Sequence, residues 1–228
     1  MMEIKTGFIL IDKPLGLSSH GVVNYLRRVS GLKRIGHAGT LDPLASGLMI
    51  LAVGREYTKQ LGKLIKLDKE YQADIYLGAT SPSYDREQEV IPSYNGQRLK
   101  KTQIKQAVLN YSGPIEQRPP IFSAKKIQGQ RAYRLARRAE AFTPKTQTIN
   151  IYEIKITSYR WPHLKIRVKC SSGTYIRSLA HDLGQTLGTG AYLYDLKRTK
   201  INGFSLKKAI KLKKIQAKNL NKYLKNSL

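Results

Sequence analysis

Asp42 stands in a glycine-framed segment whose residue types suit ligand binding and catalysis. The segment Gly36–Gly47 reads GHAGTLDPLASG, in which small residues let the backbone approach a ligand while His37 and Asp42 project functional groups. A carboxylate can act as the nucleophile of covalent catalysis without a metal or a cofactor. An aspartate followed by Pro43 is also typical of a helix N-cap with proline at the first helical position. Taken alone, the segment favours the cap.

Two further motifs accompany this segment in a fixed order. Phe8–Ser19 reads FILIDKPLGLSS, Cys170–Ser178 reads CSSGTYIRS, and Asp182-Leu183-Gly184 follows. Together the motifs closely resemble the signatures of bacterial TruB-type tRNA pseudouridine-55 synthases, over about residues 7 to 205. The resemblance implies that the chain isomerises the uridine at position 55, in the T-loop of tRNA, to pseudouridine. It also implies that Asp42 is the nucleophile and that no cofactor takes part.

The reaction breaks the glycosidic C–N bond, rotates the base and joins C5 to the sugar. A carboxylate can promote it by attacking C6 of the pyrimidine, or by promoting departure of the base from C1′ and capturing the sugar. The sequence leaves both routes open.

The resemblance assigns two more side chains to the reaction. Tyr71 occupies the position of the family's active-site tyrosine and would stack on the uracil ring, which contributes about 1–3 kcal/mol per base. Core packing on an alternating strand is the alternative for Tyr71. Arg177 is the candidate partner of Asp42, because a nearby guanidinium favours the charged form of a carboxylate. The alternative for Arg177 is a surface arginine that is solvated or touches phosphate.

Three other residues take their roles from the resemblance alone. A base inside a folded RNA loop must be flipped out to reach a carboxylate, and His37 is the candidate that braces the vacated space. Lys13 is expected either to support the active-site loop or to contact RNA. Leu196 matches the position of a hydrophobic pocket residue in the family.

The charge balance predicts a polyanionic partner. The chain has 41 Lys+Arg against 15 Asp+Glu, a net charge of +26, although lysine-rich codon usage would give the same excess. Between Arg118 and Arg138 basic residues interleave with Phe122 and Tyr133, and no Asp or Glu occurs among them. This pattern is typical of a nucleic-acid-binding surface, so we expect contacts with tRNA phosphates and a steep salt dependence. The candidate phosphate ligands are Lys125, Lys126, Arg131 and Arg134.

Periodicity predicts the elements that position these residues. A Ser18/Ser19 cap should start a helix that continues to Val29. The other expected helices are Glu56–Ile65, Thr102–Tyr111, Ala132–Glu140 and Thr174–Leu187. The expected strands are Gly7–Ile11, Gly47–Val53, Glu70–Leu77, Thr146–Tyr159, His163–Cys170 and Ala191–Lys200. We expect loops at residues 31–43 and, on the surface, at residues 80–98. The resulting class is α+β, with a pseudouridine-synthase-like mixed, largely antiparallel sheet flanked by helices.

We expect residues 1–205 to form the catalytic domain and residues 206–228 a basic helical tail. Lys207–Lys225 carries eight lysines among apolar residues at helical spacing, and both RNA contact and packing against the domain are open for it. The residues after Ser205 leave no room for the PUA module that often ends family members. Residues 81–88 depart from the Thr-Asp-Thr-type loop of many members, which leaves their RNA contacts open.

Other features restrict the environment and the chemistry. Cys170 is the single cysteine, which fits a reducing compartment, and the apolar run Gly7–Ile11 is too short for a signal peptide. We therefore expect a cytoplasmic, stand-alone, monomeric protein. The His and Cys spacing forms no zinc motif, and no nucleotide-binding glycine motif occurs, so no metal is expected.

Two functions from other classes remain as alternatives. One is a non-catalytic tRNA-binding or tRNA-folding chaperone, and the other is a ribosomal-type RNA binder. The joint presence of Asp42, Tyr71 and Arg177 favours the enzyme.

Overall fold

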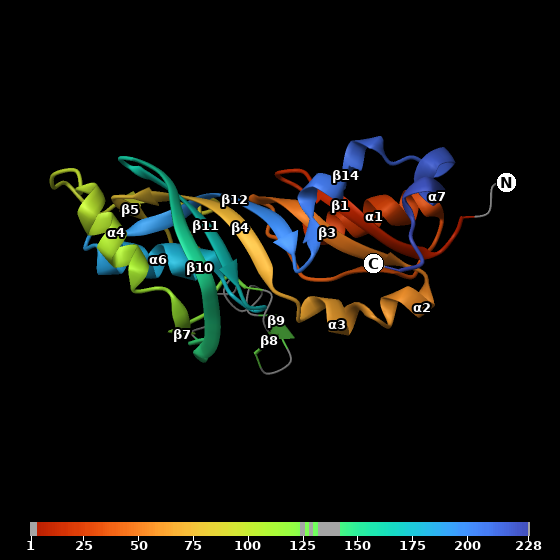
Figure 1. The fold of residues 1–228 in the computed structure, drawn as a ribbon, viewed down its shortest axis with the longest axis horizontal. Coiled ribbons are helices and arrows are strands. Elements are labelled where there is room, and N and C mark those ends of the chain that lie inside the picture. Colours follow the sequence, from red (N-terminus) through yellow and green to blue (C-terminus); the bar gives the residue numbers. More distant parts are fainter. Residues whose placement is uncertain (1–3, 124–125, 128–129, 132–141, 228) are drawn as a thin grey trace. The chain divides into compact units, whose positions relative to one another are not determined.

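The computed structural model describes residues 4–123, 126–127, 130–131 and 142–227, which form two compact units (Figure 1). Unit 1 comprises Met1–Tyr71 and Lys197–Leu228, and unit 2 comprises Gln72–Leu196. Strands β4 (Lys69–Leu77) and β12 (Ala191–Ile201) each contribute residues to both units. Each unit combines helices with largely antiparallel strands, which confirms the α+β class. Among the described residues, no helix has the length and apolar character needed to cross a membrane.

The sheet of unit 1 is built around β3 (Ala45–Val53). All of its residues except Ser46 are buried, as a continuous apolar run predicts for a strand covered on both faces. β1 (Gly7–Lys13) pairs with β3 in antiparallel orientation along its whole length. The shorter strands of this sheet are β2 (Ile35–His37), which pairs with β3, β13 (Phe204–Ser205), which pairs with β12, and β14 (Ile210–Lys211), which runs parallel to β1. The parallel pair makes the sheet mixed.

Helix α1 (Ser19–Ser30) begins and ends where its capping residues predict. Ser18 accepts a hydrogen bond from the amide of Gly21, and Gly31 ends the helix at a positive φ of 72°. The segment predicted as one helix at Glu56–Ile65 is two short helices, α2 (Arg55–Thr58) and α3 (Leu61–Ile65). Side chains from this segment pack on a core cluster formed by Phe8, Leu10, Ala38, Leu48, Ile50, Ala52 and Ile201.

Unit 2 contains a long hairpin of β10 (Gln147–Arg160) and β11 (His163–Cys170) (Figure 1). β7 (Gly113–Gln117) pairs with β10 on its other side, and β4 lies next to β11. The helices in the described part of this unit are α4 (Lys101–Leu109) and α6 (Ile176–Thr186). Two small sheets pair β5 (Ala79–Thr80) with β6 (Ile91–Pro92), and β8 (Lys126–Ile127) with β9 (Gln130–Arg131). The predicted helix Ala132–Glu140 lies outside the described residues.

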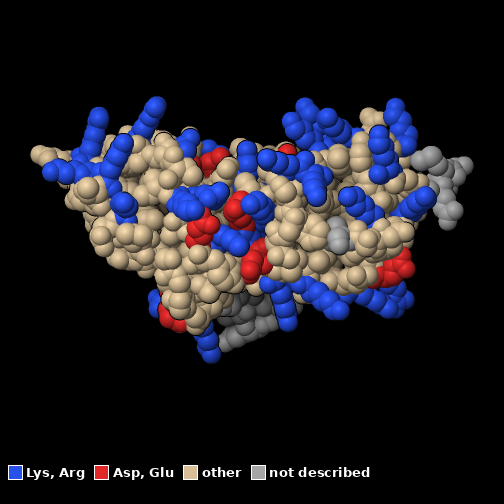
Figure 2. Space-filling view, in the orientation of Figure 1, with Lys and Arg blue, Asp and Glu red and all other residues tan. Residues whose placement is uncertain are grey.

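The tail is not the continuous amphipathic helix that its apolar spacing predicted, but a series of short elements. The C-terminal segment consists of the strand β14, the 3₁₀ helices η1 (Leu206–Lys208), η2 (Leu212–Lys214) and η3 (Ala217–Asn219), and the short helix α7 (Leu220–Tyr223). Leu212, Ile215 and Leu220 are buried, and Lys225 exchanges two backbone hydrogen bonds with Phe8 of β1. The apolar residues therefore pack within unit 1, while Lys and Arg gather on the surface over β14 and α7 (Figure 2).

Both predicted loops also contain structure that the sequence did not reveal. Residues 31–43 include β2, which pairs with β3. Residues 80–98 include β6, and Ser81, Ser83 and Asp85 at the start of this segment are buried rather than on the surface. This burial matters for the candidate active site.

Candidate active site

Asp42 lies in a turn that leads directly into β3, so the N-cap interpretation is wrong. No helix follows Pro43: the amide of Ala45, the first residue of β3, donates to the carbonyl of Asp42 at 3.0 Å. On the other side of the turn, the amide of Gly16 donates to the carbonyl of Pro43 at 2.8 Å. The structural role that competed with catalysis for Asp42 is therefore absent, and the turn is fixed by backbone hydrogen bonds.

Lys13 is fully buried at the end of β1. Its ammonium donates to the carbonyls of Pro14 and Leu17, at 3.0 and 2.5 Å. These bonds hold the 14–17 turn, whose Gly16 contacts Pro43. The complete burial of this ammonium argues against contact with RNA, one of the two roles considered for this lysine.

His37 lies on β2, three residues before Thr40. Burial lowers the pKa of its imidazole, and the positive charge of Arg198 lowers it further, so the neutral ring is favoured at pH 7. Its Nδ1 is buried and has no hydrogen-bond partner among the described residues. A neutral, partly buried ring is suited to stacking or filling space rather than to contact with phosphate as a cation.

Tyr71 ends the first of the two segments of unit 1 and lies on β4, where it is 8% exposed. Burial alternates along the strand, and Tyr71 shares its side with Ala73, Ile75 and Leu77. The alternation that the sequence predicted for this strand is confirmed. Leu196, on β12 of unit 2, is also buried.

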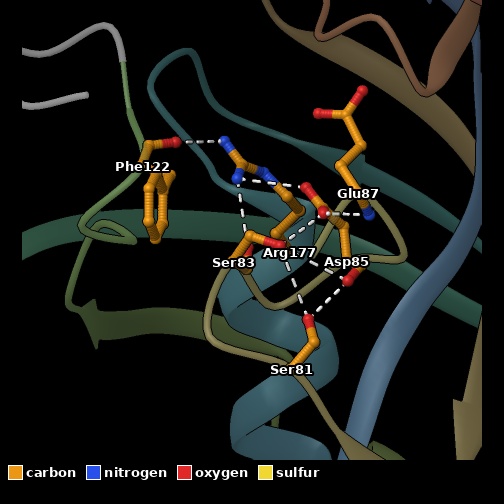
Figure 3. Close-up of polar contacts among 6 residues, drawn as sticks. All are labelled: Ser81, Ser83, Asp85, Glu87, Phe122 and Arg177. Atoms are coloured by element: carbon orange, nitrogen blue, oxygen red, sulfur yellow. Dashed lines mark hydrogen bonds and ion pairs between the residues drawn. The ribbon is translucent and has the colours of Figure 1, made fainter. Parts of the chain in front are cut away.

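Arg177 is buried at the second position of α6, which contradicts the surface-arginine alternative. Figure 3 shows its guanidinium directed at Asp85, with Nη1 3.2 Å from the carboxylate Oδ2. Nη1 also donates to the carbonyl of Ser83 at 3.1 Å, and Nη2 donates to that of Phe122 at 2.8 Å. The guanidinium is thus fixed from three directions within unit 2.

Asp85 is the site residue that the sequence interpretation missed. It is completely buried, and its Oδ1 accepts hydrogen bonds from the Ser83 hydroxyl at 2.6 Å and from the Glu87 amide at 2.9 Å (Figure 3). Ser81 donates its hydroxyl to the Asp85 carbonyl. The alternation of Ser81, Ser83 and Asp85 was a usable signal, since hydroxyl groups at every second position can satisfy a buried aspartate, here one at its carboxylate and one at its backbone carbonyl.

Helix α6 also carries two half-buried titratable groups, His181 and Asp182. Burial raises the pKa of Asp182 to about 6 and lowers that of the adjacent His181. The His181 ring stacks on Tyr84, with ring centroids 3.9 Å apart. These groups lie in the same unit as Arg177, and the raised pKa of Asp182 brings the titration of this carboxyl close to neutral pH.

The remaining RNA-binding candidates cannot be placed in full. Lys125 and Arg134 lie outside the described residues, and for Lys126 and Arg131 the structure describes only the backbone, in β8 and β9. A cavity of about 560 Å³ between α4 and β10 contains none of the predicted site residues. Among the described residues, no group of three or more His, Cys, Asp or Glu is arranged to hold a metal ion.

Comparisons with known proteins support the same family as the motifs. Two family models match successive parts of the chain. Residues 27–176 match the model described as "TruB family pseudouridylate synthase (N terminal domain)", and residues 177–228 match the model described as "tRNA pseudouridylate synthase B C-terminal domain". The tRNA pseudouridine synthase B of Chlamydia felis is 42% identical over 214 residues, which cover 91% of this chain and 88% of the relative. Its namesake from Phocaeicola vulgatus is 45% identical and covers 90% of both chains.

Solved structures agree at the level of the fold. A chain in the crystal structure of a Cbf5-Nop10-Gar1 complex matches 99% of this chain with a TM-score of 0.74 and 28% identity, and 61% of that chain is covered. A chain of an H/ACA RNP bound to a substrate RNA containing 2′-deoxyuridine matches 91% of this chain with a TM-score of 0.68 and 28% identity, and 51% of it is covered. This chain therefore spans between half and two thirds of those solved chains. The protein belongs to the TruB family of pseudouridylate synthases and is an isomerase of that family.

Proposed function

We propose that this protein converts the uridine at position 55, in the T-loop of tRNA, to pseudouridine, and that Asp42 is the nucleophile. The observation that carries the proposal is the Asp42 turn. It has the complete glycine-framed motif, caps no helix, and is held by hydrogen bonds from Gly16 and Ala45. Relatives at 42–45% identity named tRNA pseudouridine synthase B support tRNA as the substrate.

The reaction is an isomerisation, so its atoms balance without an oxidant, a reductant or a second substrate. The C1′–N1 bond breaks, the uracil rotates while bound, the C1′–C5 bond forms, and C5 loses its proton as N1 gains one. Asp42 contributes a carboxylate that attacks either C6 of the base or C1′ of the sugar. The base reaches it after flipping out of the RNA loop, with His37 bracing the vacated space.

The other assigned residues stabilise the charge of Asp42, bind the uracil and contact the tRNA. Arg177 supplies the cation that favours the ionised carboxylate of Asp42. Tyr71 stacks on the uracil, and Leu196 belongs to the hydrophobic pocket. Lys125, Lys126, Arg131 and Arg134 contact tRNA phosphates, and Lys13 supports the active-site loop. The enzyme acts in the cytoplasm as a monomer without a cofactor.

A T-arm transcript tests the proposal. Incubation with the protein should form one pseudouridine at position 55, detected by nucleoside mass spectrometry and mapped by primer extension. A transcript with cytidine at that position serves as the control and should yield none. Tight binding to the transcript without any pseudouridine would instead support the non-catalytic chaperone.

A further inference from the structure

Arg198 connects β12 to the loop that precedes Asp42. Its side chain is 1% exposed, and its guanidinium contacts three backbone carbonyls within unit 1. Nε donates to Leu48 at 2.7 Å, Nη2 to Gly39 at 3.1 Å, and Nη1 approaches Thr40 at 3.5 Å. One side chain therefore joins Leu48, in the first half of β3, to Gly39 and Thr40, two consecutive residues of the loop before Asp42.

The partners of Arg198 are unusual for a buried charge. Among the described residues, no carboxylate lies within ion-pair distance of its guanidinium, so its hydrogen bonds go to backbone carbonyls. Burying a cation is costly unless its donors are all satisfied, and a planar fork of five donors can reach carbonyls on two chain segments at once. At 1% exposure, this residue is not available to bind phosphate.

Ser19 holds the same loop from α1. It is 2% exposed, and its hydroxyl both accepts from the Leu41 amide at 2.7 Å and donates to the Leu41 carbonyl at 2.8 Å. Gly16 holds Pro43 through one backbone hydrogen bond, from its amide to the Pro43 carbonyl. The residues immediately before and after Asp42 are thus both fixed, and Arg198 fixes the two residues before Leu41.

We propose that Arg198 is a positioning residue for catalysis, which holds the backbone of Gly39 and Thr40 so that the carboxylate of Asp42 is presented in its reactive geometry. Ser19 assists through its two hydrogen bonds to Leu41. This inference rests on the proposed role of Asp42 as nucleophile. Arg198 touches no reacting atom; it acts through the loop, and misplacing a reacting group by about 1 Å can cost about 10²-fold in rate.

The test compares Arg198→Met, Arg198→Lys and the control Lys197→Met, an exposed neighbour on the same strand. Single-turnover pseudouridine formation is measured with saturating enzyme on the T-arm transcript, and the Kd for the transcript is measured separately. We expect a loss of about 10²-fold in rate for Arg198→Met with little change in Kd. Arg198→Lys should recover part of the rate, because it restores the charge but not the fork of donors. Lys197→Met should keep the native rate.

A second variant and a second measurement keep the proposal falsifiable. Ser19→Ala removes both bonds to Leu41 while leaving Arg198 intact, so it carries the test if Arg198→Met does not fold. In both variants, amide hydrogen exchange should accelerate at Leu41 and Ala45 relative to the centre of α1. Folded variants with native single-turnover rates would overturn the proposal.

Asp42→Asn, assayed in parallel, separates this inference from the proposed function. Native activity in Asp42→Asn would remove the nucleophile assignment. Loss of activity in Asp42→Asn, combined with a native rate in folded Arg198→Met and Ser19→Ala, would remove the positioning role alone.

Discussion

Each unit contains a buried arginine that lies in, or contacts, one of the family motifs. The charges of the two arginines are compensated in opposite ways. Arg177 in unit 2 faces the carboxylate of Asp85 at 3.2 Å and also binds two carbonyls. Arg198 in unit 1 binds carbonyls of Leu48, Gly39 and Thr40. Ionic pairing balances the charge of the first, whereas oriented backbone dipoles solvate the charge of the second. A buried arginine can therefore serve either to fix charges or to fix a loop, and its partners distinguish the two.

Removing the counter-charge of Arg177 should have the largest effect on stability. In Asp85→Asn the buried guanidinium loses the carboxylate that it faces, and breaking a buried ion pair typically costs about 3–5 kcal/mol. The free energy of unfolding from urea titrations checks this expectation. Glu153→Gln is the matched control, because Glu153 forms exposed pairs with Lys155 and Arg167 and its loss should change stability little. Equal effects in the two variants would contradict the account of Arg177.

The sequence predicted the helices and strands around Arg177 and Arg198 better than it predicted the residues that the two guanidinium groups contact. The cap at Ser18, the buried run of β3 and the alternation of β4 are local patterns, and the structure confirms them. Asp42 before Pro43 was misleading, because the same pair of residues also fits a turn that enters a strand.

The partner of Arg177 was missed because its environment is not local. A stretch rich in serine and aspartate predicts a solvent-exposed turn, but Asp85 is buried by contact with a residue 92 positions away. The C-terminal segment failed for a related reason. Its apolar residues have helical spacing, yet Ile210 and Lys211 pair with β1 and interrupt a continuous helix.

Gly47→Ala should disturb the Arg198 region with the next largest effect. Gly47 has a φ of +105°, and a Cβ at this position would lie 2.3 Å from the Arg198 carbonyl oxygen. Backbone strain alone costs about 1–3 kcal/mol, and displacement of β12 adds to it. Gly203→Ala, which has open space around its Cβ, is the control and should unfold like the native protein. Thermal denaturation of both variants measures the difference, and a native midpoint for Gly47→Ala would contradict the close packing.

The pH dependence of stability should expose the titratable group on α6. The pKa of Asp182 is raised to about 6 from 3.8. As the pH rises, the unfolded chain therefore loses this proton at a lower pH than the folded state does. Native stability therefore falls as the pH rises from about 4 to 6, and the full penalty persists above pH 6. Asp182→Asn should raise the thermal midpoint at pH 7.5 relative to the native protein, and by less at pH 4. A gain that is equal at both pH values would rule out this carboxyl as the cause.

The smallest expected effect is a change in the pKa of His37 when the charge of Arg198 is removed. Because the charge of Arg198 contributes to the lowered pKa of His37, Arg198→Met should raise that pKa towards its ordinary value of 6.5. Burial remains in the variant, so the shift should be partial. NMR titration of the His37 ring protons measures it. An unchanged His37 titration in folded Arg198→Met would show that the charge of Arg198 does not act on this ring.

The role of Asp42 as nucleophile is tested most directly by single-turnover release of tritium from a T-arm transcript labelled at C5 of uridine. Asp42→Asn should bind the transcript with native affinity and release no tritium above background. Glu89→Gln, which alters an exposed carboxylate, should release it at the native rate. Tritium release by folded Asp42→Asn at the native rate would contradict the assignment of Asp42 as the nucleophile.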